Sequence, residues 1–79
     1  MPKFPVDAPS ERVLRALQTP RFQIVNRGNH ISLVRNEPGG KRTPMTLPGH
    51  RTIKGSTLRT ALTQSGISRE DFLRAYDDA

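Results

Sequence analysis

Hydrophobic and polar residues follow a helical period early in the chain. Apolar residues one helical turn apart follow Ser10, namely Val13, Leu14 and Leu17. Because serine is a good N-cap, this spacing predicts an amphipathic helix over residues 10–18. The helix must end before Pro20, since the residue preceding a proline disfavours helical backbone angles. Prolines are frequent ahead of it and predict a flexible, Pro-rich lead over residues 1–9.

A period of two replaces the helical period in the next part of the chain. Segments 22–26 and 31–35 are rich in β-branched or aromatic residues and are separated by turn-forming residues, which predicts a β-hairpin. A second turn, rich in Pro and Gly, precedes a third antiparallel strand predicted over residues 42–47. Pro44 lacks a backbone N–H and therefore places this strand at an edge of the sheet.

The helical period returns in the last third of the chain. Residues 48–54 are predicted as a loop, and a helix then begins at Gly55 and ends before Gly66, the expected C′ residue. Ser68 is the expected cap of a last helix. The predicted buried side chains of these two helices are Leu58, Ala61, Leu62, Phe72, Leu73 and Tyr76. The order α-β-β-β-α-α predicts an α+β fold over residues 10–79, in which helices cover one face of a three-stranded antiparallel sheet.

Length and composition narrow the class of protein. A chain of 79 residues forms one domain with a thin core. The sequence has no cysteine, so a disulfide framework and a thiolate metal site are excluded and a reducing compartment is favoured. The first residues lack the apolar stretch of a signal peptide, and no segment approaches the length that spans a bilayer. We expect a soluble, cytoplasmic protein without a membrane partner.

The charge is strongly asymmetric. The net charge is +6, and four of the seven acids lie in the last ten residues. Between residues 20 and 60 there are eight basic residues and a single acid, Glu37. A concentrated positive field of this kind is typical of a polyanion-binding surface, although many small domains are basic for solubility alone. Aromatic residues are scarce, which disfavours a single-strand binder that stacks bases.

Two histidines lie among these basic residues, and their chemistry suits RNA cleavage. His30 follows a glycine turn into a strand, and an imidazole with an ordinary pKa of about 6.5 can take a proton from a 2′-hydroxyl. His50, in the following loop, is a candidate acid or phosphate contact. The alternative for each is a structural or solvated histidine. Gly28 would let the backbone turn sharply and approach a phosphate, and the start of the helix at Gly55 would offer free N–H groups to another.

The expected RNA-binding residues are mainly basic and carry no sequence information. They are Arg27, Gly28, Asn29, Arg35, Lys41, Arg42, Arg51, Lys54, Ser56 and Arg59. The two histidines are far apart in the sequence and no cysteine or carboxylate cluster lies near them, so we expect no metal and no other cofactor. This predicts a metal-independent transesterification.

Several of these segments together resemble the HicA (YcfA-like) toxin family. They are Gly28-Asn29-His30, the strand ending Thr46-Leu47-Pro48, Gly49-His50, the segment from Ile53-Lys54-Gly55-Ser56-Thr57-Leu58-Arg59 to Leu62, and Ser65-Gly66-Ile67-Ser68. The resemblance covers about residues 10–75. The sequence departs from the family pattern at Asn29, where the family usually has Ser, and in residues 51–56, which lack the common Pro before Gly.

The resemblance implies a fold like that of a double-stranded-RNA-binding domain and a bacterial or archaeal cytoplasmic toxin. It implies ribonuclease activity on messenger RNA, catalysis by His30, and neutralisation by a HicB-type antitoxin. The alternatives are a non-catalytic double-stranded-RNA-binding module, an inactivated homologue that only binds, and an interaction protein whose basic face takes an acidic partner. The RNA-binding and antitoxin-binding faces would coincide if the antitoxin blocked the site directly.

Overall fold

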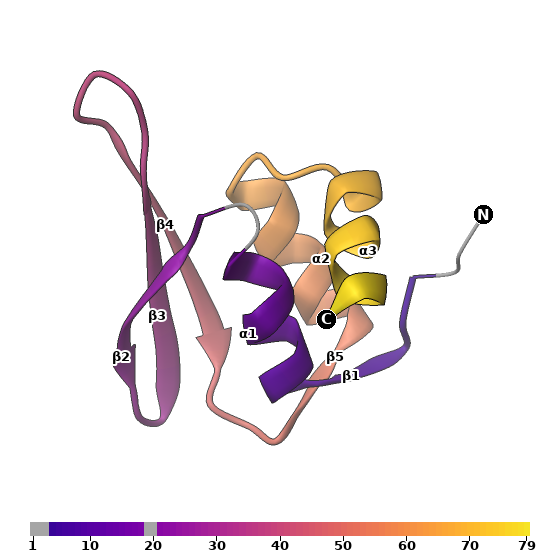
Figure 1. Ribbon diagram of the computed structural model, residues 1–79. Helices are drawn as coiled ribbons and strands as arrows, with labels where there is room; N and C mark the ends of the chain where they lie inside the picture. Colours follow the sequence, from indigo (N-terminus) through magenta and orange to yellow (C-terminus); the bar gives the residue numbers. More distant parts are fainter. Residues whose placement is uncertain (1–3, 19–20) are drawn as a thin grey trace.

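The structure of the protein is a computed structural model, and it describes residues 4–18 and 21–79 (Figure 1). The elements in chain order are β1 (Asp7–Pro9), α1 (Ser10–Gln18), β2 (Gln23–Arg27), β3 (His30–Asn36), β4 (Arg42–Pro48), β5 (Thr52–Lys54), α2 (Gly55–Gln64) and α3 (Arg69–Asp78). The predicted helix over residues 10–18 and the predicted α+β class are confirmed.

Three of the strands form the predicted antiparallel sheet in the order β2-β3-β4. The predicted hairpin is β2–β3, which carries a register shift between Ile24 and Asn26. Strand β4 pairs with β3 alone in this sheet, so the prediction that Pro44 lies on an edge strand is confirmed. The register sets His30, the first residue of β3, opposite Pro48, the last residue of β4.

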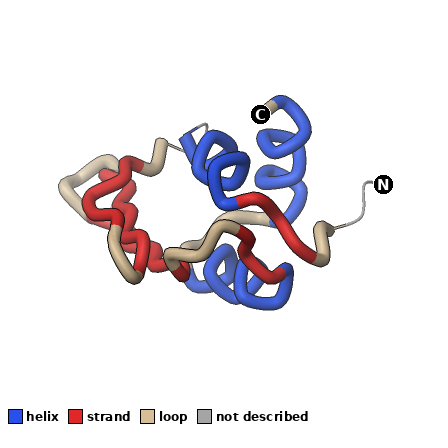
Figure 2. The backbone as a smooth tube through the Cα atoms, turned by 90° about the horizontal axis from the view of Figure 1, so that it is seen from below, coloured by secondary structure: helices blue, strands red, loops and turns tan. Residues whose placement is uncertain are grey.

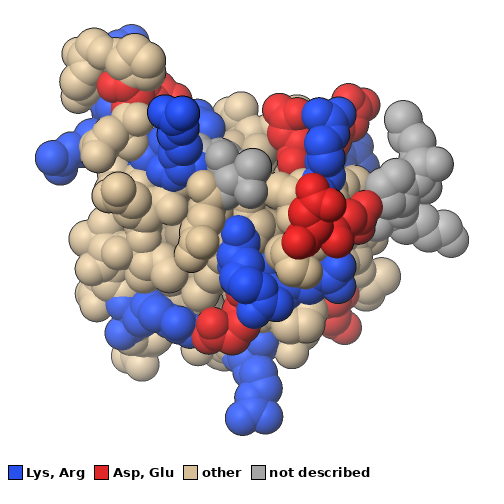
Figure 3. Space-filling model, viewed as in Figure 1, with Lys and Arg blue, Asp and Glu red and all other residues tan. Residues whose placement is uncertain are grey.

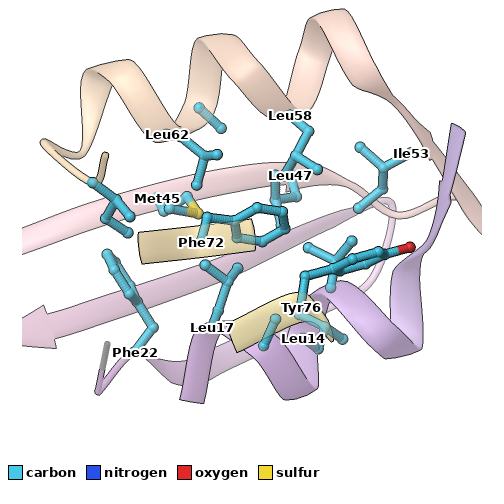
Figure 4. Close-up of a cluster of buried hydrophobic side chains, with 14 of the residues drawn as sticks. Leu14, Leu17, Phe22, Met45, Leu47, Ile53, Leu58, Leu62, Phe72 and Tyr76 are labelled. Carbon is cyan, nitrogen blue, oxygen red and sulfur yellow. The ribbon is translucent and has the colours of Figure 1, made fainter. Parts of the chain in front are cut away.

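The helices all lie on one side of this sheet, and the core fills the space between them (Figures 1 and 2). Alternate residues of β3 and β4 face this core: Ile31, Leu33, Met45 and Leu47. The predicted helical positions complete it, because Leu58, Ala61, Leu62, Phe72, Leu73 and Tyr76 are all buried (Figure 4). The ring of Phe72 has no exposed surface and stacks on Tyr76 with centroids 5.5 Å apart.

The first and last helices pack on one another. Arg12 of α1 donates a hydrogen bond from Nε to the Tyr76 carbonyl at 3.1 Å, and its guanidinium lies 4.1 Å from the centre of the Tyr76 ring. A cation over an aromatic face is attracted by the ring quadrupole. This contact joins α1 to α3 through polar as well as apolar groups.

Two sequence predictions are wrong in the same place. Residues 52–54, predicted as loop, form β5, and residues 7–9, predicted as part of a flexible lead, form β1, which pairs with β5. Ala8 of β1 is fully buried, and the Ser10 N–H donates to the Arg51 carbonyl at 2.8 Å. Residues 1–3 of the predicted lead lie outside the described residues. The fold therefore begins before Ser10, and a second, two-stranded sheet ties its start to the loop after β4.

The ends of α2 and α3 use the residues that the sequence indicates. Gly66 has a φ of +72° and follows α2, as a C′ glycine does. Ser68 caps α3, because its Oγ accepts the Asp71 N–H at 3.1 Å. Asp71 and its neighbour Glu70 also place negative charge where the helix dipole favours it. Both predicted boundaries are confirmed.

Candidate functional site

His30 and His50 line one open depression of about 560 Å³ beside the end of β4. Lys54 lines the same depression, together with the hydroxyl-bearing residues Thr46, Thr52 and Thr57. Both histidines and Lys54 are exposed. The start of β3, the loop after β4 and the end of β5 thus bring three side chains that can carry positive charge to one concave surface.

The sheet register explains why the two histidines meet. His30 is opposite Pro48, and the next residue, Gly49, donates its N–H to the Asn29 carbonyl at 2.9 Å. A Cβ on Gly49 would lie 2.7 Å from that same carbonyl oxygen and even closer to the Gly28 carbonyl oxygen. Only glycine fits at this crossing, because no real Cβ approaches another atom so closely. The β2–β3 turn and the loop carrying His50 are therefore held directly against each other.

A second depression of about 360 Å³ shares His50 with the first. Its lining includes Glu11, Arg27 and Arg51. Arg27 donates to Glu11 in an exposed ion pair, and this hydrogen bond, with the charge of Arg27, lowers the pKa of the Glu11 carboxyl below its ordinary value. Basic side chains project from the lower edge of Figure 3, where the β2–β3 turn and the β4–β5 loop lie, while acidic ones gather over α3. His50 therefore lies between Lys54 in the first depression and Arg27 and Arg51 in the second.

The start of α2 differs from the expectation that Gly55 offers a free N–H. That N–H donates to the carbonyl of Val6, the residue before β1, at 2.6 Å, so it is already occupied. The N-cap is Lys54, whose side chain caps no backbone N–H. Ser56 lines a third depression of about 380 Å³ with Arg59, whose guanidinium lies 5.3 Å from the centre of the Phe4 ring. Lys54 lines both this depression and the one with the histidines.

Three predicted RNA-binding residues lie at the other end of the β3–β4 hairpin: Arg35, Lys41 and Arg42. Strand geometry puts Arg35 about 17 Å from His30, five residues along the same strand. Arg35 is half-buried, donates to Glu37 at 2.7 Å and lies 5.2 Å from the Phe22 ring centre. The structure therefore does not bring these three residues to the histidines.

Gly28 lies in the expected turn between β2 and β3. Its φ is not in the left-handed region, and a Cβ there would meet nothing within 4 Å. The turn therefore does not require glycine at position 28, and the crossing that does require glycine lies at Gly49. The approach of Gly28 to a phosphate stays a prediction. Asn29 contributes its carbonyl to that crossing.

Sequence reasoning missed the threonines of the first depression and Glu11 in the second. A signal for Thr46 was present, because it alternates with the buried Met45 and Leu47 and so must face away from the core. Thr52 and Thr57 had no comparable signal. Glu11 lies on a helix that the sequence did not connect to the site.

The described residues include no group of three or more His, Asp or Glu side chains that could hold a metal ion. Within the same ranges, no helix is long and apolar enough to cross a membrane. No protein-family model, curated protein or solved structure matches this chain.

Proposed function

We propose that this protein is a metal-independent endoribonuclease that cleaves messenger RNA, acting as the toxin of a HicA/HicB-type toxin-antitoxin system in the cytoplasm. The observation that supports it best is the shared depression of His30, His50 and Lys54. The resemblance to HicA, which covers about residues 10–75, also supports it.

The depression offers what phosphodiester cleavage needs. His30, as a neutral imidazole, takes the proton of a 2′-hydroxyl, and the 2′-oxygen attacks the adjacent phosphorus. Lys54 lies at the start of α2, where its charge and the helix dipole both stabilise the negative charge of the phosphate. The products are a 2′,3′-cyclic phosphate and a free 5′-hydroxyl. Side chains of the depression supply the base and the positive charge, and neither of these roles needs an added cofactor.

The electrostatic surface favours RNA as the polyanion. Arg27 and Arg51 line the neighbouring depression, so a strand that places one phosphate beside His30 can place another beside these guanidinium groups. The 2′-hydroxyl, which the mechanism consumes, restricts the reaction to RNA. The chemistry therefore distinguishes RNA from DNA without base contacts.

The test is cleavage of a long single-stranded RNA in EDTA by the wild type and by His30→Ala, with folding checked by circular dichroism. We expect His30→Ala to cleave about 10²- to 10⁴-fold more slowly, the usual contribution of a general base. Gln23→Ala, exposed on β2, is the matched control and should cleave at the wild-type rate. Equal cleavage by wild type and His30→Ala would refute the assignment. RNA binding without cleavage by any variant would make the protein a binding module.

The antitoxin proposal is tested with a co-expressed HicB-type antitoxin. If the antitoxin covers the site, Lys54→Glu weakens both RNA binding and antitoxin binding, because Lys54 lines the depression. Gln23→Glu, at an exposed position on β2, is the control and should leave both largely intact. Loss of RNA binding alone in Lys54→Glu would show that the two surfaces are separate.

A further inference from the structure

His50 lies where a second catalytic group is needed. It lines the depression that contains His30 and also the one that contains Arg27 and Arg51. A strand whose phosphates occupy both depressions must therefore pass His50. His30 supplies the base, and cleavage also needs a group that protonates the departing 5′-oxygen.

The backbone fixes the spacing of the two histidines. His30 directly follows Asn29, and His50 directly follows Gly49. The Gly49 N–H donates a hydrogen bond to the Asn29 carbonyl at 2.9 Å. His30 is opposite Pro48, and His50 is two residues beyond Pro48. His50 therefore lies in the loop just past the paired end of β4, and both histidines line the same depression. Two imidazoles that extend from such positions can reach opposite sides of one phosphodiester.

We propose that His50 is the general acid of the cleavage reaction, an inference that rests on the proposed ribonuclease function. His30 takes the 2′-hydroxyl proton as the bond from the 2′-oxygen to phosphorus forms. The bond from phosphorus to the 5′-oxygen breaks, its electron pair stays on that oxygen, and the His50 imidazolium gives it a proton. His30 ends protonated and His50 neutral, and proton exchange with water restores both.

The charged groups around His50 fit this role. From the first depression it faces His30 and Lys54, and from the second it faces Arg27, Arg51 and Glu11. Glu11 is paired with Arg27, so the free site is predominantly positive. A bound phosphate brings the negative charge that stabilises an imidazolium beside it. Lys54 remains to balance the charge that develops on the phosphorane oxygens.

A leaving group that needs no proton separates the acid from the base. In RNA with a sulfur in place of the 5′-bridging oxygen, the leaving group departs as a thiolate, so its departure does not require a general acid. We expect His50→Gln to lose about 10²- to 10⁴-fold in kcat/KM on ordinary RNA and less than about 10-fold on the sulfur-bridged RNA. His30→Gln should lose activity on both substrates, because both need the base. Arg51→Gln, in the same loop as His50, should lose activity equally on the two substrates.

The pH dependence provides a second measurement. Wild-type kcat/KM should rise and then fall with pH, as for one base and one acid. His30→Gln should lack the rising limb, and His50→Gln the falling limb. A merely structural role of His50 would lower the whole profile without removing one limb.

The outcomes distinguish the two proposals. If the wild type cleaves neither substrate, the proposed function and the role of His50 both fail. If His30→Gln behaves as expected but His50→Gln cleaves ordinary RNA at the wild-type rate, or loses equally on both substrates, only the assignment of His50 is overturned. Circular dichroism of His50→Gln and its urea midpoint establish that the variant is folded.

Discussion

Replacing Gly49 with alanine should separate the two histidines without removing either of them. The new Cβ would lie 2.7 Å from the Asn29 carbonyl oxygen and closer still to the Gly28 carbonyl oxygen. An ordinary contact begins at 3.4 Å, so the two segments must part by more than about 0.7 Å. All three obstructing atoms, in Gly28 and Asn29, belong to the backbone and not to a flexible side chain. The hydrogen bond from the Gly49 N–H to Asn29 would be strained at the same time.

The size of the effect follows from this displacement. Forcing atoms into a packed site costs about 1–3 kcal/mol, and with a urea m-value of about 1 kcal/mol per molar a loss of 2 kcal/mol lowers the midpoint by about 2 M. A misplacement near 1 Å costs about 100-fold in rate, so we expect Gly49→Ala to cleave RNA about 10- to 100-fold more slowly.

Gly28→Ala is the matched control, because its Cβ would meet nothing within 4 Å and its φ is not in the left-handed region. Both variants are compared with the wild type by urea denaturation and by initial rates of RNA cleavage. The free energy of unfolding of Gly28→Ala should lie within about 0.5 kcal/mol of the wild-type value. Equal stability of Gly49→Ala and Gly28→Ala would refute the close crossing. A loss of cleavage in Gly28→Ala at unchanged stability would show that Gly28 approaches the phosphate.

Three further outcomes follow from the structure. Ala8→Asp buries an unpaired charge at a fully buried position and should leave the protein unfolded by circular dichroism, while Val6→Asp, at a position 82% exposed, should not. Ser68→Ala removes the cap of α3 and should lower the free energy of unfolding by about 1 kcal/mol in urea titrations. Arg27 lowers the pKa of Glu11, so their pair stabilises the fold at a pH above 4.5, the ordinary pKa, and this stability is lost as the pH falls through the lowered pKa. Glu11→Gln should therefore lose less stability than the wild type below pH 4.5. An acid titration of stability that is the same for both proteins would contradict the pairing.

The elements that the sequence predicts correctly are those with a local signal. The turn after β3, the cap at Ser68 and the C′ glycine Gly66 each act within a few residues, so their chemistry is visible in the sequence. Strand β5 has only three residues, and its partner β1 ends in a proline and lies far away in the sequence. Such a pairing has no local period, which is why both segments were predicted as irregular.

The candidate site is predictable to the extent that the sheet register is. A hairpin with β3 beginning at His30 and β4 ending at Pro48 brings the loop after β4 back to His30, and so to His50. The same register carries Arg35 to the opposite end, which charge counting along the sequence does not reveal. The occupied Gly55 N–H was equally hidden, because its acceptor, Val6, precedes a strand that the sequence did not indicate.

The packing of α1 on α3 sets the order of events during synthesis. The guanidinium of Arg12 can contact the carbonyl and ring of Tyr76 only after nearly all of the described chain has emerged from the ribosome. Contacts between distant segments close late, because the intervening chain must first be ordered. We therefore expect the nascent protein to stay unfolded, and its site unassembled, until translation of α3 is complete. The candidate site would then assemble only after the chain that carries it has been made.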